Sequence, residues 1–141
     1  IISQLIRGFT KAIREAGNTN VETLAAAFQR AAEAAYKAVM KPKEGTILTV
    51  ARGMGEKINE LLPEYKDDIS GLILKTIEYG DEVLKKTPEM LPVLKEAGVV
   101  DSGGMALMVA LKGIASVLTG KEEDVLNGIA LPEKTEKRNI L

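Results

Sequence analysis

Apolar residues recur every three or four positions along most of the chain, which is the spacing of one face of an α-helix. The first such run covers residues 2–13 and stops at Gly17 and Asn18, a pair typical of a helix C-terminus. A longer run follows over residues 20–40, with Asn20 placed to cap its start. The many alanines of this second helix favour close packing against its neighbours.

Proline and glycine then interrupt the pattern. Residues 41–45 contain Pro42, which does not fit a helix interior, and Gly45, which can adopt a positive φ angle. Helical spacing resumes over residues 46–62, with Thr46 as a suitable cap. This stretch therefore predicts a turn followed by a third helix.

The second half of the chain predicts three more helices. One covers residues 67–87, where aspartates precede the first turn and lysines occupy the last turn, as the helix dipole favours. A shorter helix is predicted to start at Pro88 and to end at Gly98. The last, over residues 103–119, is apolar on nearly all sides, which indicates a helix buried among others.

These helices predict an all-α fold, an antiparallel up-and-down helical bundle or barrel. With 141 residues in total, the chain has the length of one domain. We place this domain at residues 1–120 and expect an amphipathic turn and a charged tail over residues 121–141.

Composition removes several classes of function. Nineteen basic residues against twenty acidic ones leave a net charge of −1, which argues against nucleic-acid binding. The chain has no His and no Cys, which excludes Ser-His and Cys-His catalysis and cysteine zinc sites. No apolar stretch is long enough to insert into a membrane and no signal peptide is visible, so we expect a cytoplasmic protein.

Candidate chemistry concentrates in two glycine turns, at residues 44–49 and 101–104. Each turn combines glycine with a small hydroxyl residue at a predicted helix start, where free N–H groups and the helix dipole favour an anion. The alternative, which the residues alone favour, is that both turns are ordinary helix caps. A shared site requires both starts at one end of the bundle, which we expect if the short segment from Pro88 spans the bundle.

The same residues carry a family resemblance. The segments "AYKAVMKPKEGTILTVA" (residues 35–51) and "TPEMLPVLKEAGVVDSGGMALMVALKG" (residues 87–113) resemble dihydroxyacetone-kinase-like nucleotide-binding domains. Within these, the chain is most similar to the ATP-binding N-terminal domain of bacterial fatty acid kinase. The resemblance implies a barrel of antiparallel helices that binds ATP or ADP at one rim, with magnesium held by aspartates. It also implies transfer of the γ-phosphoryl group to a fatty acid, or a dihydroxyacetone-like acceptor, presented by a fatty-acid-binding carrier protein.

Carried over by position, the resemblance implies a set of nucleotide-binding residues in both turns. Those of the first turn would border the nucleotide, and those of the second would lie near its ribose or adenine. They are Gly45, Thr46, Thr49, Asp101, Ser102, Gly103 and Gly104.

Two motifs of the family are absent from the chain. These are the aspartate-rich magnesium motif DGDTGxN and the phosphate-binding loop GxRGNSG, both of which come before the segment that here reads "IISQLIRGF". We therefore expect an incomplete bundle that lacks its N-terminal helices, with no catalytic residue, no metal ligand and at most weak nucleotide affinity. Uncovered apolar surface would favour a homo-oligomer. The alternative is a non-catalytic helical interaction or oligomerisation module.

Overall fold

The computed structural model describes residues 1–17 and 20–119, and in this part of the chain all regular structure is helical. The all-α prediction is therefore confirmed. The elements are α1 (Ile2–Ala16), α2 (Val21–Lys37), α3 (Ile47–Leu61), the 3₁₀ turn η1 (Leu62–Tyr65), α4 (Ile69–Met90), α5 (Pro92–Ala97) and α6 (Ser102–Thr119). The tail predicted over residues 121–141 lies outside the described residues.

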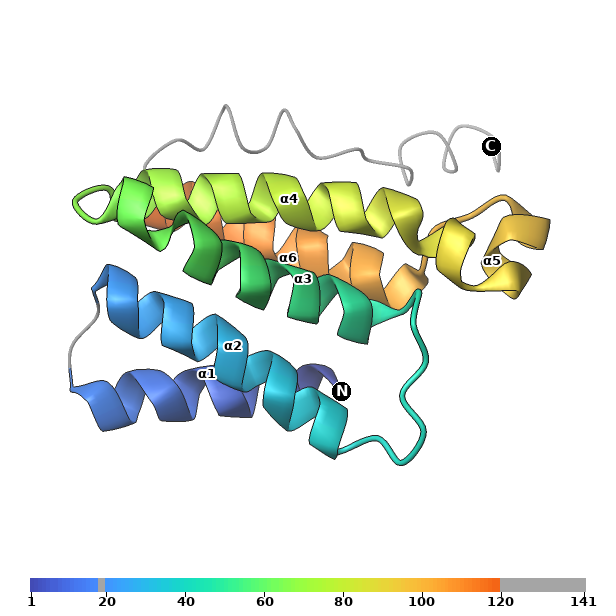
Figure 1. Ribbon diagram of the computed structural model, residues 1–141, viewed down its shortest axis with the longest axis horizontal. Coiled ribbons are helices and arrows are strands. Elements are labelled where there is room, and N and C mark those ends of the chain that lie inside the picture. The colour runs from blue at the N-terminus through green and yellow to red at the C-terminus, as the bar shows by residue number, and fades with distance from the viewer. Residues whose placement is uncertain (18–19, 120–141) are drawn as a thin grey trace, which may run out of the picture.

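The long helices form an antiparallel bundle in chain order (Figure 1). The first packs on α2, α2 on α3, and α3 on α4, while α6 lies against both α3 and α4. The short α5 projects at one end of the bundle, between the end of α4 and the start of α6 (Figure 1). Short connections between neighbours thus produce the up-and-down order that the helical spacing predicted.

Two predicted caps, at Asn20 and Thr46, are present, and Asp68 forms a third. Asn20 Oδ1 accepts the N–H of Thr23 at 2.8 Å, and Asp68 Oδ1 accepts the N–H of Gly71 at 2.9 Å. At the start of α3, Thr46 Oγ1 accepts the N–H of Leu48 at 3.3 Å. Each cap satisfies one of the N–H groups that a helix start leaves without an intrahelical partner.

The core lies between α2, α3, α4 and α6. Its fully buried large side chains are Val50, Met54, Ile58, Leu72 and Met108. Most alanines of α2 are buried in the protein interior, and Ala27 and Ala35 are 0% exposed. Because alanine projects only one methyl group, α2 and α3 approach closely, as the sequence predicted.

The boundary predicted at Pro88 is wrong. The fourth helix continues through Pro88 to Met90, and α5 begins only at Pro92. Proline has no N–H to donate to the carbonyl of Leu84, four residues earlier. The hydroxyl of Thr87 donates to this carbonyl instead, at 2.7 Å, so the carbonyl keeps a partner and the helix continues.

An apolar groove separates α1 from α6. It encloses about 370 Å³, and Ile6 and Ile114 at its edge are 60% and 56% exposed. The other lining side chains are Leu5, Phe9, Leu24, Phe28, Ala31, Ala51, Met54, Ile73, Ile77, Leu107, Leu111 and Ala115. Part of the apolar stripe that predicted the first helix is therefore exposed. No helix among the described residues combines the length and the apolar character needed to cross a membrane.

The hydroxyl of Thr87 is completely buried, and we expect it to be important for stability. It donates to Leu84 and accepts the N–H of Asp101 at 3.1 Å. Thr87→Val keeps the shape of the side chain but leaves both backbone groups without this partner, which should lower the free energy of unfolding by about 1–3 kcal/mol. Thr87→Ser is the control and should cost less in urea denaturation. Equal losses for the two variants would contradict this role of the hydroxyl.

Candidate functional site

The two predicted glycine turns lie at the same end of the bundle (Figure 1). A methyl group placed on Gly103 would be 3.5 Å from Cβ of Ile47, which puts the starts of α3 and α6 in direct contact. The reason differs from the expected one, because α5 has only six residues and does not span the bundle. Since α4 alone reverses the chain direction between α3 and α6, these two helices run parallel and start together.

At the first turn, the loop before α3 folds back on the helix through hydroxyl groups. The N–H of Gly45 donates to Thr49 Oγ1 at 2.9 Å, and Thr46 Oγ1 donates to the carbonyl of Lys43 at 2.8 Å. Thr49 is buried, with 4% of its surface exposed. Its hydroxyl therefore serves as an internal anchor for the Gly45 amide.

At the second turn, Asp101 caps α6. Its Oδ2 accepts the N–H of Gly104 at 2.8 Å, and its carbonyl accepts the N–H of Met105 at 2.9 Å. The N–H of Asp101 itself donates to the buried hydroxyl of Thr87. Ser102 is exposed beside this cap. The capping alternative is thus realised at both turns, whereas nucleotide binding at the seven predicted residues stays a prediction.

Two of the glycines are explained by packing inside the protein. Gly45 has a φ angle of +85°, and a Cβ atom there would lie 2.8 Å from Cβ of Leu91 and 3.0 Å from the carbonyl oxygen of Thr87. A Cβ on Gly104 would lie 2.9 Å from Leu84 Cδ1. The ends of α3, α4 and α6 therefore meet more closely than a side chain at either position would allow.

Gly103 differs from these two glycines, because a Cβ atom there would meet nothing closer than 3.3 Å. Within the described residues, the N–H groups of Ile47, Ser102 and Gly103 have no hydrogen-bond acceptor. They belong to the first turns of α3 and α6, where the positive ends of two helix dipoles lie together. This rim can accept an anion through backbone donors, and Gly103 is its least crowded position.

A polar network that the sequence did not reveal supports the first turn. The carboxylate of Glu44 accepts hydrogen bonds from Tyr36 at 3.0 Å and Thr49 at 3.1 Å, and Arg52 forms an ion pair with it. The Arg52 guanidinium lies over the Tyr36 ring, 5.6 Å from its centroid. We call Tyr36, Glu44, Thr49 and Arg52 the Glu44 network. Only Thr49 was predicted as a site residue, because helical spacing does not show which side chains meet across a loop.

The network shifts the pKa values of its ionisable groups, those of Glu44 and Tyr36 among them. Burial acts to raise the pKa of Glu44, but hydrogen bonds from Tyr36, Arg52 and Thr49 outweigh it and leave this pKa below its usual value. Burial, together with the hydrogen bond to Glu44, raises the pKa of the Tyr36 hydroxyl. The network therefore holds an ionised carboxylate and a neutral phenol at neutral pH.

The described residues do not fit a magnesium ion. Across residues 1–17 and 20–119, no group of three or more acidic side chains is arranged to hold a metal. Asp101 and Glu44, the acidic groups of the two turns, are engaged in the helix cap and in the Glu44 network.

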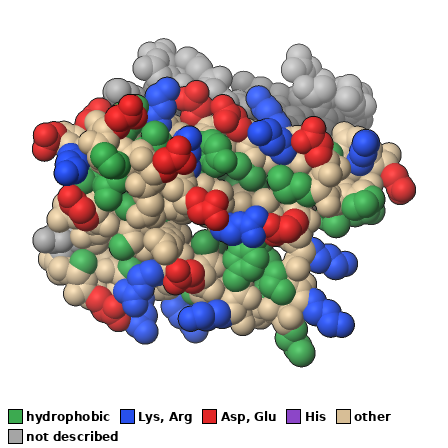
Figure 2. Space-filling model, in the orientation of Figure 1, with side chains coloured by type: hydrophobic (Ala, Val, Ile, Leu, Met, Phe, Trp, Pro, Cys, Tyr) green, Lys and Arg blue, Asp and Glu red, His purple; other side chains and the backbone are tan. Residues whose placement is uncertain are grey.

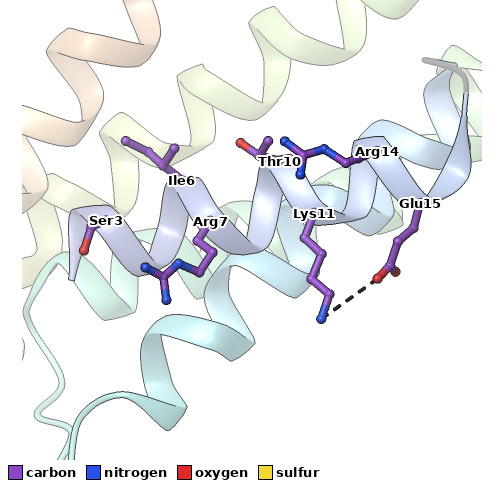
Figure 3. Close-up of a pocket in the computed structure, with 7 residues that line it drawn as sticks. All are labelled: Ser3, Ile6, Arg7, Thr10, Lys11, Arg14 and Glu15. Carbon is purple, nitrogen blue, oxygen red and sulfur yellow. Dashed lines mark ion pairs between the residues drawn. The ribbon is translucent and has the colours of Figure 1, made fainter.

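A hollow along α1 is a weaker candidate for a ligand site than the rim. Figure 3 shows a hollow whose lining side chains all project from α1, including a Lys11–Glu15 pair at 3.9 Å. These side chains are Ser3, Ile6, Arg7, Thr10, Lys11, Arg14 and Glu15. A single helix lines this hollow, so it does not enclose a ligand. Acidic and basic side chains alternate over the face in Figure 2, in line with the net charge of −1.

These features define an all-helical domain with two helix starts joined at one rim. The sequence matches the DAK2 domain family over residues 1–116, and the chain belongs to this family. It is 48% identical over 121 residues to Protein YloV of Bacillus subtilis, and 46% identical over 122 residues to an uncharacterised protein of Staphylococcus aureus. An uncharacterised protein of Staphylococcus epidermidis is 45% identical over 122 residues.

The matched region covers 86% of this chain but only 22% of each of these three relatives. The chain thus spans about a fifth of their length. The dihydroxyacetone-kinase-like resemblance is confirmed at the level of the domain family.

We expect Gly45→Ala to destabilise the protein more than Gly17→Ala. Both glycines have a positive φ angle, but a Cβ on Gly17 would meet nothing within 4 Å. Gly17→Ala should therefore cost about 1 kcal/mol for the left-handed backbone, and Gly45→Ala about 3 kcal/mol, because crowding against α4 is added. Urea denaturation of both variants measures the difference. Similar losses would show that the helix ends can separate easily.

Stability should also depend on the ionisation of Glu44. A carboxyl group whose pKa is lowered by folding stabilises the folded state above its unfolded pKa, here about 4.5, and this contribution is lost as pH falls through the folded value. The stability difference between the wild type and Glu44→Gln should therefore shrink below about pH 4.5. Denaturation at several pH values tests this. A difference that stays constant down to pH 3 would contradict the ionised network.

Proposed function

We propose that this chain forms part of the ATP-binding domain of a kinase and contacts the nucleotide with the rim where α3 and α6 start. Support comes from membership of the DAK2 domain family and from the backbone donors grouped at this rim. The single observation that carries the proposal is the contact between the two helix starts, each with N–H groups that lack an internal acceptor. Such donors favour a polyanion such as a nucleoside triphosphate.

Residues of the two turns would have different tasks. The amides of Ile47, Ser102 and Gly103, with the exposed hydroxyl of Ser102, would contact the nucleotide directly. Gly45, Thr46, Thr49, Asp101 and Gly104 would set the shape of the turns from behind. This division refines the predicted site, in which all seven residues were direct neighbours of the nucleotide.

The reaction we propose is transfer of the γ-phosphoryl group of ATP to a fatty acid or a dihydroxyacetone-like acceptor held by a carrier protein. Such a transfer depends mainly on positioning and on charge stabilisation rather than on covalent chemistry by the protein. The described residues supply nucleotide contacts, and we assign them no catalytic role. Magnesium, whose ligands are not among them, would neutralise charge on the phosphates. Cytoplasmic location and a fatty-acid-binding partner belong to the same proposal.

A non-catalytic assembly role is the second candidate. The apolar groove between α1 and α6, with half-exposed Ile6 and Ile114 at its edge, favours association with another apolar surface, a second copy of the chain included. In that role the two turns would be helix caps only. Binding of nucleotide separates the two candidates.

The test is binding of Mg-ATP to the complete gene product. A ligand that binds only the folded state at 100 times its dissociation constant raises the free energy of unfolding by about 2.7 kcal/mol. Gly103→Ala should weaken binding about tenfold or more by blocking the approach to the backbone, a loss of about 1.4 kcal/mol. Gly113→Ala is the matched control on the same helix, since a Cβ there would meet nothing within 4 Å.

The outcomes are distinct. No stabilisation of the wild type by Mg-ATP would favour the assembly role. If Mg-ATP stabilises the wild type but binds the Gly103→Ala and Gly113→Ala variants with equal affinity, the nucleotide binds elsewhere. Unfolding without nucleotide shows whether either variant is damaged on its own.

A further inference from the structure

A negative charge stands beside the turn proposed to bind phosphate. Glu44 directly precedes Gly45, and its carboxylate accepts a hydrogen bond from the Thr49 hydroxyl, which in turn accepts one from the Gly45 N–H at 2.9 Å. These bonds anchor the turn to α3. An uncompensated carboxylate at this position would also repel a polyphosphate, since like charges a few ångströms apart oppose each other even in a solvated setting.

Arg52 is placed to cancel this charge. Its guanidinium pairs with Glu44 Oε1, lies over the ring of Tyr36 at 5.6 Å from the centroid, and approaches Glu56 Oε1 with its Nε at 3.8 Å. The side chains of Arg52 and Glu44 are each 45% exposed. The guanidinium is therefore held in place by two helices and remains near enough to the surface to affect an approaching anion.

Arg52 has two acidic partners, Glu44 and Glu56, and only Glu44 lies near the turn. Glu44 is three residues before α3, whereas Glu56 lies nine residues beyond the first residue of that helix, about 14 Å along the axis. The loss of Arg52 would thus free one carboxylate at the rim and another far from it. This difference provides a control within the same network.

We infer that Arg52 is a positioning residue for nucleotide binding, acting through Glu44: it neutralises the carboxylate that anchors the Gly45 turn, so that the anchor does not repel phosphate. The inference rests on the proposed function. It also explains why an acidic residue stands at the entrance of an anion-binding turn. The carboxylate supplies the acceptor that orients Thr49, and the guanidinium removes the electrostatic cost.

The two possible roles of Arg52, a structural brace or a charge-compensating residue, predict different nucleotide binding by a double variant. If Arg52 only braces the loop, removing Glu44's charge as well should leave the loop as loose or looser. If Arg52 compensates charge, Glu44→Gln should restore binding in the Arg52→Ala background. Glutamine keeps a carbonyl oxygen for the hydroxyls of Tyr36 and Thr49 but carries no charge.

The experiment measures the dissociation constant of Mg-ATP for the complete gene product in three variants: Arg52→Ala, Arg52→Ala with Glu44→Gln, and Arg52→Ala with Glu56→Gln. We expect Arg52→Ala to weaken binding about threefold to fivefold at low salt, the range of an exposed ion pair, and less at high salt. The Glu44→Gln double variant should return to within about twofold of the wild type. The Glu56→Gln double variant should stay weak.

Failure of Glu44→Gln to restore binding would overturn the inference, and so would equal recovery with Glu56→Gln. Absence of Mg-ATP binding by the wild type is a separate result that removes the proposed function itself. Unfolding curves without nucleotide confirm that each variant is folded. A dissociation constant for Arg52→Ala equal to that of the wild type would also contradict a role for the guanidinium.

Discussion

Three helix ends meet at one rim of this bundle, and their close approach is the constraint on which the rest of the site depends. Gly45 and Gly104 occupy the contact, and a Cβ atom at either position would collide with α4. Because the ends of α3 and α6 are fixed against α4, their first turns also lie fixed beside each other. The arrangement of backbone donors at the rim follows from this packing and needs no ligand to produce it.

The rim is held together by polar groups that serve two partners at once. The hydroxyl of Thr87 donates to Leu84 and accepts from Asp101, and the hydroxyl of Thr49 donates to Glu44 and accepts from Gly45. Each of these hydroxyls uses its proton in one direction and a lone pair in the other. Loops that would otherwise expose unpaired backbone groups are thereby joined to buried positions of α3 and α4, while the amides of Ile47, Ser102 and Gly103 have no acceptor within the described residues.

The two segments that carry the family resemblance are neighbours in space. Residues 35–51 include the loop into α3, and residues 87–113 include the end of α4, α5 and most of α6. They meet where Gly45 packs against Thr87 and Leu91. Similarity in sequence therefore corresponds to one continuous part of the molecule. Both segments also fall within the single family match over residues 1–116.

Local features of the chain determined the helices, whereas the meeting of their ends depended on tertiary structure. Helical spacing and the caps at Asn20 and Thr46 could be predicted because each involves residues no more than four positions apart. The boundary at Pro88 could not be predicted, because it depended on a threonine hydroxyl that replaced a missing backbone donor. The Glu44 network and the common rim of α3 and α6 depend on loop lengths and on how closely glycines let helices approach. These distances are set only when the whole bundle packs.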